Sequence, residues 1–140
     1  MTENVEGGIP VNFVYTAGIA GEEFLRGLKK GKILGNKCKC GLSYIPPRLF
    51  CEDCFSMIEK NFESPTIGKV FSFSVANVSF DGEKITPETI ALIDIGESKL
   101  MHRLNIPGEK VRLGMKVKAV FKPAEARKGS INDIKYFEAI

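Results

Sequence analysis

The residues best suited to chemistry are four cysteines, Cys38, Cys40, Cys51 and Cys54, which lie within 17 of the 140 residues of a chain that has no others. They form a Cys-x-Cys-Gly pair and a Cys-x-x-Cys pair, ten residues apart. Two such pairs on two turns can place four thiolates in a tetrahedron around Zn²⁺. In a reducing compartment this cluster favours metal binding over disulfides. We therefore predict a structural zinc site that supplies the folding energy of a segment with almost no core.

The first pair departs from the commoner Cys-x-x-Cys knuckle, since only Lys39 separates Cys38 from Cys40. A tighter knuckle leaves two alternatives open, a metal-free ribbon or a free thiol at one of these two positions. Redox or catalytic use of the cluster is disfavoured, because no histidine lies near it in sequence to activate a thiolate.

No enzyme signature accompanies the cluster. The sequence has no Gly-x-Ser-x-Gly, no His-Glu-x-x-His and no glycine-rich phosphate loop. The single histidine, His102, shares strand parity with Leu100 and Leu104, which predicts a hydrogen-bonded core histidine rather than a general base. We expect a binding protein, not an enzyme.

The segment before the cysteines predicts an extended arm and one helix. Pro10 disfavours a helical conformation at the residue before it, so residues 9–15 are expected to be extended. A helix is predicted from Thr16, as N-cap, to Lys30, with Gly31 as its left-handed C-terminal residue.

This helix should not be stable alone. Phe24 and Leu28 lie on one apolar stripe, but three glycines fall inside the helix, each costing roughly 1 kcal/mol relative to alanine. The helix must therefore dock, either on its own chain or on a partner.

Residues 64–140 predict a small antiparallel barrel. Turn signals separate five apolar segments near residues 68–80, 89–96, 99–106, 116–123 and 131–138. In the first, the apolar parity changes after Val75, which requires a bulge and is typical of the long bent strand of a five-stranded OB barrel. Phe71, Phe73 and Phe80 are predicted to lie in the core. Lys116, Lys118 and Lys122 alternate with apolar residues and predict a solvated outer face.

Charge and hydropathy exclude other classes. Net charge is +3, and the whole excess lies in residues 64–140, which carry twelve Lys or Arg and nine Asp or Glu. This is well short of the basic patch of a dedicated nucleic-acid binder. No apolar run approaches the ~20 residues of a membrane span, and the acidic start lacks the features of a signal peptide. We expect a cytoplasmic protein.

Several of these residues together resemble a known family that combines a zinc ribbon with an OB fold. They are Phe24, the Gly27–Ile33 segment, the four cysteines with Gly41, Pro46-Pro47-Arg48, the Gly68–Ser74 strand and Leu113–Val117. The family was long classified as a domain of unknown function and is associated with acyl-CoA metabolism. The resemblance covers nearly the whole chain from about Thr16.

The resemblance implies a fold that is mainly β with an N-terminal helix, in which a rubredoxin-like zinc ribbon precedes a five-stranded OB-fold barrel. The expected division is an arm and helix in residues 1–36, the ribbon in residues 37–63 and the barrel in residues 64–140. It also implies a non-catalytic, acyl-CoA-binding accessory subunit of a thiolase-type complex. Archaeal members resemble the component that joins acetoacetyl-CoA thiolase to hydroxymethylglutaryl-CoA synthase.

A CoA site needs cations for the phosphates and a partly apolar surface for the rest of the molecule. On this chain the candidates are Arg48 beside Phe50, where the ribbon should meet the barrel, and Lys99 and Arg103 on the barrel. Two rival classes stay open. One is a single-stranded nucleic-acid binder, which the low net charge disfavours, and the other is a scaffold that binds protein alone.

Overall fold

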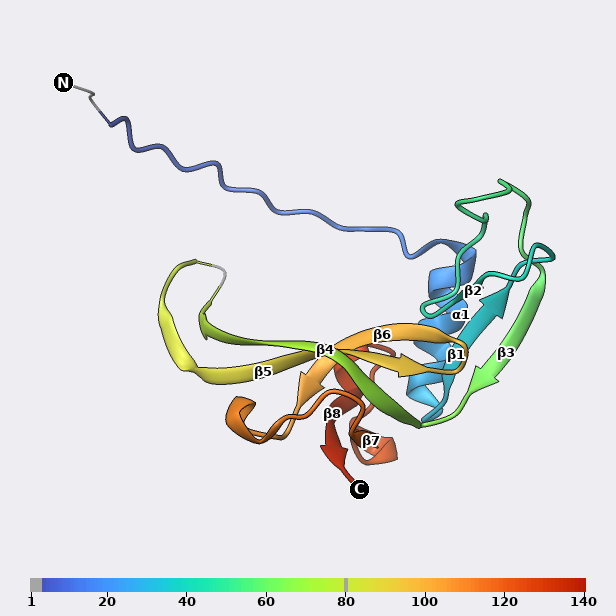
Figure 1. Ribbon diagram of the computed structural model, residues 1–140. Coiled ribbons are helices and arrows are strands. Elements are labelled where there is room, and N and C mark those ends of the chain that lie inside the picture. The colour runs from blue at the N-terminus through green and yellow to red at the C-terminus, as the bar shows by residue number, and fades with distance from the viewer. Residues whose placement is uncertain (1–3, 80) are drawn as a thin grey trace.

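The computed structural model describes residues 4–79 and 81–140, which form a small sheet with a helix against it and a barrel beside them (Figure 1). The fold is mainly β, with one α-helix in the described residues, α1 (Gly18–Lys29). Residues 4–17 are exposed and have no regular secondary structure, and Figure 1 shows them running away from the start of α1. None of the described helices is long and apolar enough to cross a membrane.

Helix α1 begins and ends close to the predicted residues, but its cap differs. The N-cap is Ala17, which makes no side-chain capping bond, so the prediction of Thr16 as N-cap is wrong. The physical reason is Gly18, whose φ of 70° turns the chain at the position where a capping side chain would have to reach the first amides. Gly31, with φ of 76°, follows the helix as predicted.

Helix α1 docks on its own chain, which was one of the two predicted alternatives. Phe24 and Leu28 are buried in the same core cluster as Ile33 of strand β1 (Ile33–Lys37). A Cβ added at Gly27 would lie 2.8 Å from Cγ of Leu34, so only glycine allows this close approach of helix and strand.

The ribbon is a three-stranded antiparallel sheet in the order β2-β1-β3, formed by Ser43–Tyr44, Ile33–Lys37 and Lys60–Ser64. Its own buried cluster is small and consists of Cys38, Tyr44, Cys51 and Ile58. This cluster is separate from the core that fills the barrel. The division at residues 36/37 and 63/64 stays a prediction.

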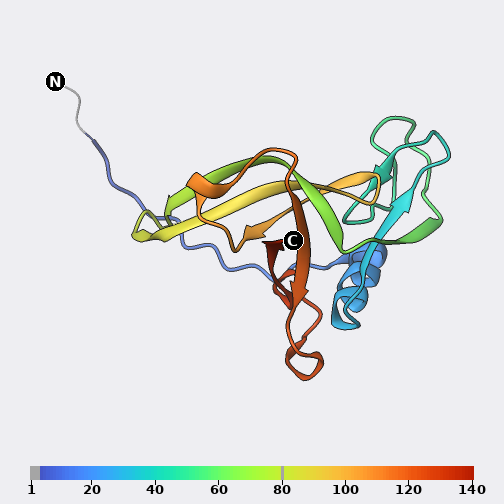
Figure 2. The ribbon, with the colours of Figure 1, turned by 60° about the horizontal axis from the view of Figure 1, so that its bottom comes forward.

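The barrel confirms the predicted OB fold. Its strands are β4 (Ile67–Val78), β5 (Lys84–Ile95), β6 (Ser98–Leu104), β7 (Lys116–Phe121) and β8 (Ile134–Ala139), closed in the order β4-β5-β6-β8-β7. All pairs are antiparallel except β6 with β8, which is parallel at Leu104 and Phe137. Figure 2 shows the barrel beside the ribbon and α1.

The barrel is filled by inward-facing side chains from every strand. Val70, Ile93, Val117, Ile134 and Phe137 are each at most 2% exposed. His102 is buried among them, as predicted, and its Nε2 lies 3.2 Å from the carbonyl of Ile131. On β7 the alternation is also as predicted, with Val117 buried and Lys116 and Lys118 exposed.

Strand β4 bends twice, and its far half leaves the barrel. The register with β5 shifts between Ala76 and Val78, close to where the change of apolar parity after Val75 predicted a bulge, and also between Val70 and Ser72. Pairing of β4 with β7 stops at Lys69, and pairing of β5 with β6 starts at Thr89. Figure 1 shows the resulting two-stranded β4–β5 extension projecting from the barrel.

The prediction that Phe71 and Phe73 lie in the core is wrong. They are 54% and 38% exposed. Strand parity tells which face of the sheet a side chain is on, but not whether that face is covered. Both residues lie beyond Lys69, where the described pairing of β4 with β7 ends, and both are exposed to solvent. Phe80, the third predicted core phenylalanine, lies outside the described residues.

Candidate metal centre and ligand surfaces

Two turns of the ribbon position the four cysteines. Cys38 directly follows β1, and Gly41, with φ of 103°, turns the chain so that its amide donates to the carbonyl of Cys38 at 3.0 Å. The second turn lies between β2 and β3, where the amide of Phe55 donates to the carbonyl of Cys51 at 3.2 Å. Both turns fold back towards one point, which explains why the short first pair still meets the second.

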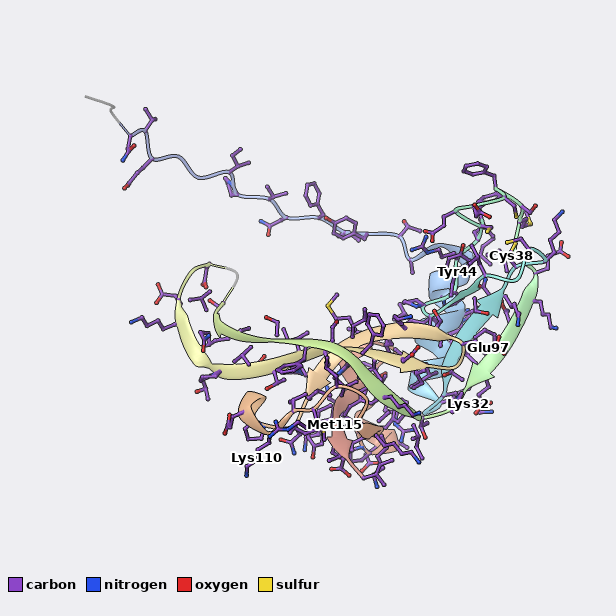
Figure 3. All side chains as sticks on the ribbon, viewed as in Figure 1. Lys32, Cys38, Tyr44, Glu97, Lys110 and Met115 are labelled. Atoms are coloured by element: carbon purple, nitrogen blue, oxygen red, sulfur yellow. The ribbon has the colours of Figure 1, made fainter. Side chains whose placement is uncertain are left out.

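The four sulfur atoms lie within 4.8 Å of one another. The Sγ atoms of Cys38 and Cys54 are 3.4 Å apart, and those of Cys40 and Cys51 are 3.6 Å apart. A tetrahedron with metal–sulfur bonds of about 2.3 Å requires sulfur–sulfur distances of about 3.8 Å. The Cys-x-Cys pair therefore does not prevent closure, and the cluster is able to bind a metal ion. Figure 3 shows the sulfur atoms grouped beside Cys38 at the end of the ribbon.

Tyr44 supports the cluster from inside the ribbon and was not found from the sequence. Its hydroxyl lies 3.3 Å from Sγ of Cys51 and accepts the amide of Glu52 at 3.3 Å. The hydrogen bond from Tyr44, together with those from the amides of Cys54 and Asp53, lowers the pKa of the Cys51 thiol to about 6, so this thiol is readily ionised for metal binding. No motif marks Tyr44, because its role depends on the second turn folding over it.

The side chain of Asn36 fixes the loop that carries Arg48. The sequence alone did not identify this role. The Asn36 side chain is 2% exposed, donates to the Arg48 carbonyl at 2.6 Å and accepts the Arg48 amide at 3.1 Å. The guanidinium of Arg48 forms an ion pair with Glu52 and lies 4.8 Å from the centre of the Tyr44 ring. Arg48 thus spans the turn that holds Cys51, and the neighbouring Phe50 is 52% exposed.

Lys99 and Arg103 lie on the outer face of β6. The Lys99 ammonium is 3.8 Å from Asp94 and 4.6 Å from the centre of the Phe71 ring. Arg103 is 3.7 Å from Glu88. The two cations are four positions apart, which is about 13 Å along a strand, and Met101 between them is 65% exposed.

The four predicted CoA-binding residues therefore occupy two places. Arg48 and Phe50 are on the ribbon beside the cysteines, while Lys99 and Arg103 are on the barrel. The structure shows no contact that joins the two pairs. Whether either pair binds CoA stays a prediction.

A cavity of about 620 Å³ lies at the rim of the barrel, where β5 and β6 diverge. Arg103 reaches it from β6, and Lys135 and Tyr136 reach it from β8. Its apolar wall is formed by Val75, Leu104, Ile106 and Pro107. Sequence reasoning found Arg103 but not the β8 residues, because the parallel β6–β8 pairing that brings them together is not readable from a local pattern.

Comparison with known proteins relates this structure to a protein family. Residues 63–122 match the family model described as ChsH2, C-terminal OB-fold domain. No curated protein matches the chain. A solved structure described as Ltp2-ChsH2(DUF35) aldolase shares the fold, with 22% identity, a TM-score of 0.62, and coverage of 84% of this chain and 91% of that chain.

A second solved structure is described as a protein with unknown function from the DUF35 family of Sulfolobus solfataricus. It is 30% identical, with a TM-score of 0.65, and the match covers 88% of this chain and 87% of that chain. With the four-cysteine ribbon and the five-stranded barrel both in place, the chain belongs to the DUF35 family.

Proposed function

We propose that this chain is a non-catalytic accessory subunit that binds an acyl-CoA and docks on a thiolase-type enzyme. The observation that carries the proposal is the shared fold with the DUF35 component of a structure described as Ltp2-ChsH2(DUF35) aldolase, a name that places such a chain beside a second protein. In the most specific form of the proposal, the partners are acetoacetyl-CoA thiolase and hydroxymethylglutaryl-CoA synthase.

The metal of the ribbon is proposed to be Zn²⁺, held by Cys38, Cys40, Cys51 and Cys54. Four thiolates in a closed tetrahedral set leave no open position, which is the donor set of structural zinc. The ion would order the two turns and supply no reaction chemistry. Zinc analysis of the purified chain tests this, with about one equivalent expected and well under half an equivalent contradicting it.

A docking role is supported by the outer face of β4 and β6. Phe71 is 54% exposed and Met101 is 65% exposed, and Lys99 lies over the Phe71 ring. Large apolar side chains beside a cation, in the absence of a covering layer, are typical of the centre of a protein interface.

Co-elution with a thiolase from the native source tests the docking. We expect a stoichiometric complex on size exclusion, and we expect the double change Phe71→Ser and Met101→Ser to abolish it. Leu113→Ser is the matched control, because Leu113 is 68% exposed in the loop before β7. If both variants bind the thiolase as wild type does, this face is not the interface.

One observation favours the alternative, a single-stranded nucleic-acid binder. OB folds bind oligonucleotides on the face of their second and third strands, and the exposed Phe71 ring beside Lys99 supplies a stacking surface of the kind that such binding uses. A labelled single-strand oligonucleotide decides between the two. Binding tighter than to acetyl-CoA, with a steep salt dependence, would replace the accessory-subunit proposal.

A further inference from the structure

The cavity at the barrel rim combines cations, carboxylates and an aromatic ring. Arg103 and Lys135 carry positive charge, Glu88 and Glu109 carry negative charge, and Tyr136 presents a half-buried ring. Its volume of about 620 Å³ lies within the ~300–1,000 Å³ of small-molecule sites. The cavity is therefore large enough for a ligand that carries several kinds of group.

The cations are only loosely engaged by their own chain. Arg103 approaches Glu88 at 3.7 Å with both side chains about half exposed. Such a pair contributes little and leaves most of the five guanidinium donors free. Lys135 forms no ion pair among the described residues, and its ammonium lies 5.5 Å from the centre of the Tyr136 ring. Two cations within one cavity, neither fully neutralised, suit a phosphate group.

The carboxylates in the cavity make it unsuitable for a ligand that carries only negatively charged groups. Glu88 and Glu109 would repel phosphates placed near them, but they would accept hydrogen bonds from the amino group of a base or the hydroxyls of a ribose. Thr89 adds a hydroxyl to the lining of the cavity. The set of donors and acceptors thus matches a nucleoside carrying phosphate.

The walls of the cavity suit the flat base of such a ligand. Val75, Leu104 and Ile106 line it together with Tyr136, and an aromatic ring offers a face on which a base stacks. Gly108 completes the wall where a Cβ would lie 2.4 Å from Cγ2 of Val75, so only glycine permits this approach.

We propose that this cavity binds the nucleotide end of an acyl-CoA, with Arg103 and Lys135 at the phosphates and Tyr136 against the adenine. The inference rests on the proposed acyl-CoA binding and deepens it by giving the ligand a place. Arg103 lies at the junction of the cavity with the outer face of β6, so the remainder of the ligand would leave past Met101 and Lys99 towards the docking face.

Calorimetry on the full-length, metal-loaded chain tests the proposal with CoA, adenosine 3′,5′-bisphosphate and pantetheine as probes. We expect the bisphosphate to compete with CoA and pantetheine alone to bind weakly. Arg103→Ala and Lys135→Ala should each lower the affinity for CoA by about tenfold or more, because each removes a charge-assisted contact to phosphate. Lys116→Ala and Lys118→Ala on β7 are the matched controls, since they remove the same charge elsewhere on the barrel.

Backbone NMR shifts on adding the bisphosphate to wild type provide a readout that needs no variant, and the changes should centre on Tyr136, Asn105 and Thr89. If CoA binds but the cavity variants match the controls and the shifts fall elsewhere, the cavity is not the site, while acyl-CoA binding stands. If neither CoA nor the bisphosphate binds wild type, both this inference and the acyl-CoA part of the proposed function are overturned.

Discussion

The carboxylate of Asp133 ties down the loop that leads into β8, and replacing it offers a stringent test of the structure. Asp133 is 1% exposed. Its Oδ1 accepts the amide of Lys128 at 3.0 Å, and its Oδ2 accepts those of Gly129 at 2.7 Å and Ser130 at 3.1 Å. Ser130 and Asp133 also form a reciprocal capping box. This loop leads into β8, where Ile134 lies in the barrel core and Tyr136 lines the rim cavity.

Asp133→Asn keeps the shape of the side chain but replaces the two charged carboxylate oxygens with one amide oxygen and one NH₂ group. If that oxygen takes the place of Oδ2, the Lys128 amide faces an NH₂ group and its bond is lost. A hydrogen bond to a charged group contributes about 1.5–3 kcal/mol, and the two remaining bonds weaken to about 1 kcal/mol each. The lost bond and the two weakened bonds together predict a loss of about 2.5–7 kcal/mol in the free energy of unfolding at pH 7, and hydration of the Lys128 amide favours the lower end.

The effect must also depend on pH in one direction. Burial raises the pKa of Asp133, but the hydrogen bonds from Lys128, Ser130 and Gly129 lower it more, so its pKa lies below the ordinary value in the folded state. A depressed carboxyl pKa stabilises the fold above the unfolded pKa of about 3.9, and this contribution is lost as pH falls through the folded value. The difference between wild type and Asp133→Asn should therefore shrink below about pH 4.

Urea unfolding followed by circular dichroism at pH 7 and at several values between pH 4.5 and 3 gives both quantities. Any metal bound by the cysteines would be lost from both proteins over the same acidic range, so the difference between them isolates Asp133. Glu125→Gln is the control, since Glu125 is exposed in the preceding turn and forms no ion pair among the described residues. A difference under 0.5 kcal/mol at pH 7, or one that persists undiminished at pH 3, would refute the reasoning.

Three further predictions concern the ribbon and the core. Tyr44→Phe should weaken zinc binding by about 10- to 100-fold in competition with a chromophoric chelator, because it removes the hydroxyl that contacts Sγ of Cys51; unchanged affinity would mean that the contact has no influence on the metal. Asn36→Ala should destabilise the ribbon by about 2–4 kcal/mol, since it leaves the Arg48 amide and carbonyl without their partner. The rate of amide hydrogen exchange should rise in the ribbon and stay unchanged in the barrel. A rise throughout the barrel would contradict this prediction. Burial lowers the pKa of His102, so the unfolded state binds a proton at a higher pH than the folded state does, and wild-type stability should fall as pH drops below about 6.5. His102→Gln should lack this part of the pH dependence in thermal unfolding. An unaltered pH profile would mean that His102 is not its cause.

Much of the fold was readable from local sequence because its determinants are local. The cysteines lie within 17 residues, so their turns meet without help from the rest of the chain. The turn signal between the predicted segments 89–96 and 99–106 corresponds to the β5–β6 hairpin, where both Gly96 and Glu97 have positive φ, as a tight two-residue turn requires. The change of apolar parity after Val75 predicted a bulge, which corresponds to the register shift between Ala76 and Val78 in β4.

Only the tertiary structure decided which predicted faces are covered. Phe71 and Phe73 alternate as buried residues do, but alternation specifies a side of the sheet and says nothing of whether another layer lies on it. Because β4 outruns its pairing with β7, these residues became surface.

The same holds for the rim cavity, in which Arg103 meets Lys135 and Tyr136 only because β8 closes the barrel in parallel beside β6. Residues more than thirty apart carry no shared local period, so a site assembled from them follows from strand order and not from sequence spacing. Tyr44 and Asn36 show the same limit at the ribbon, since each acquires its role from a loop that folds back over it.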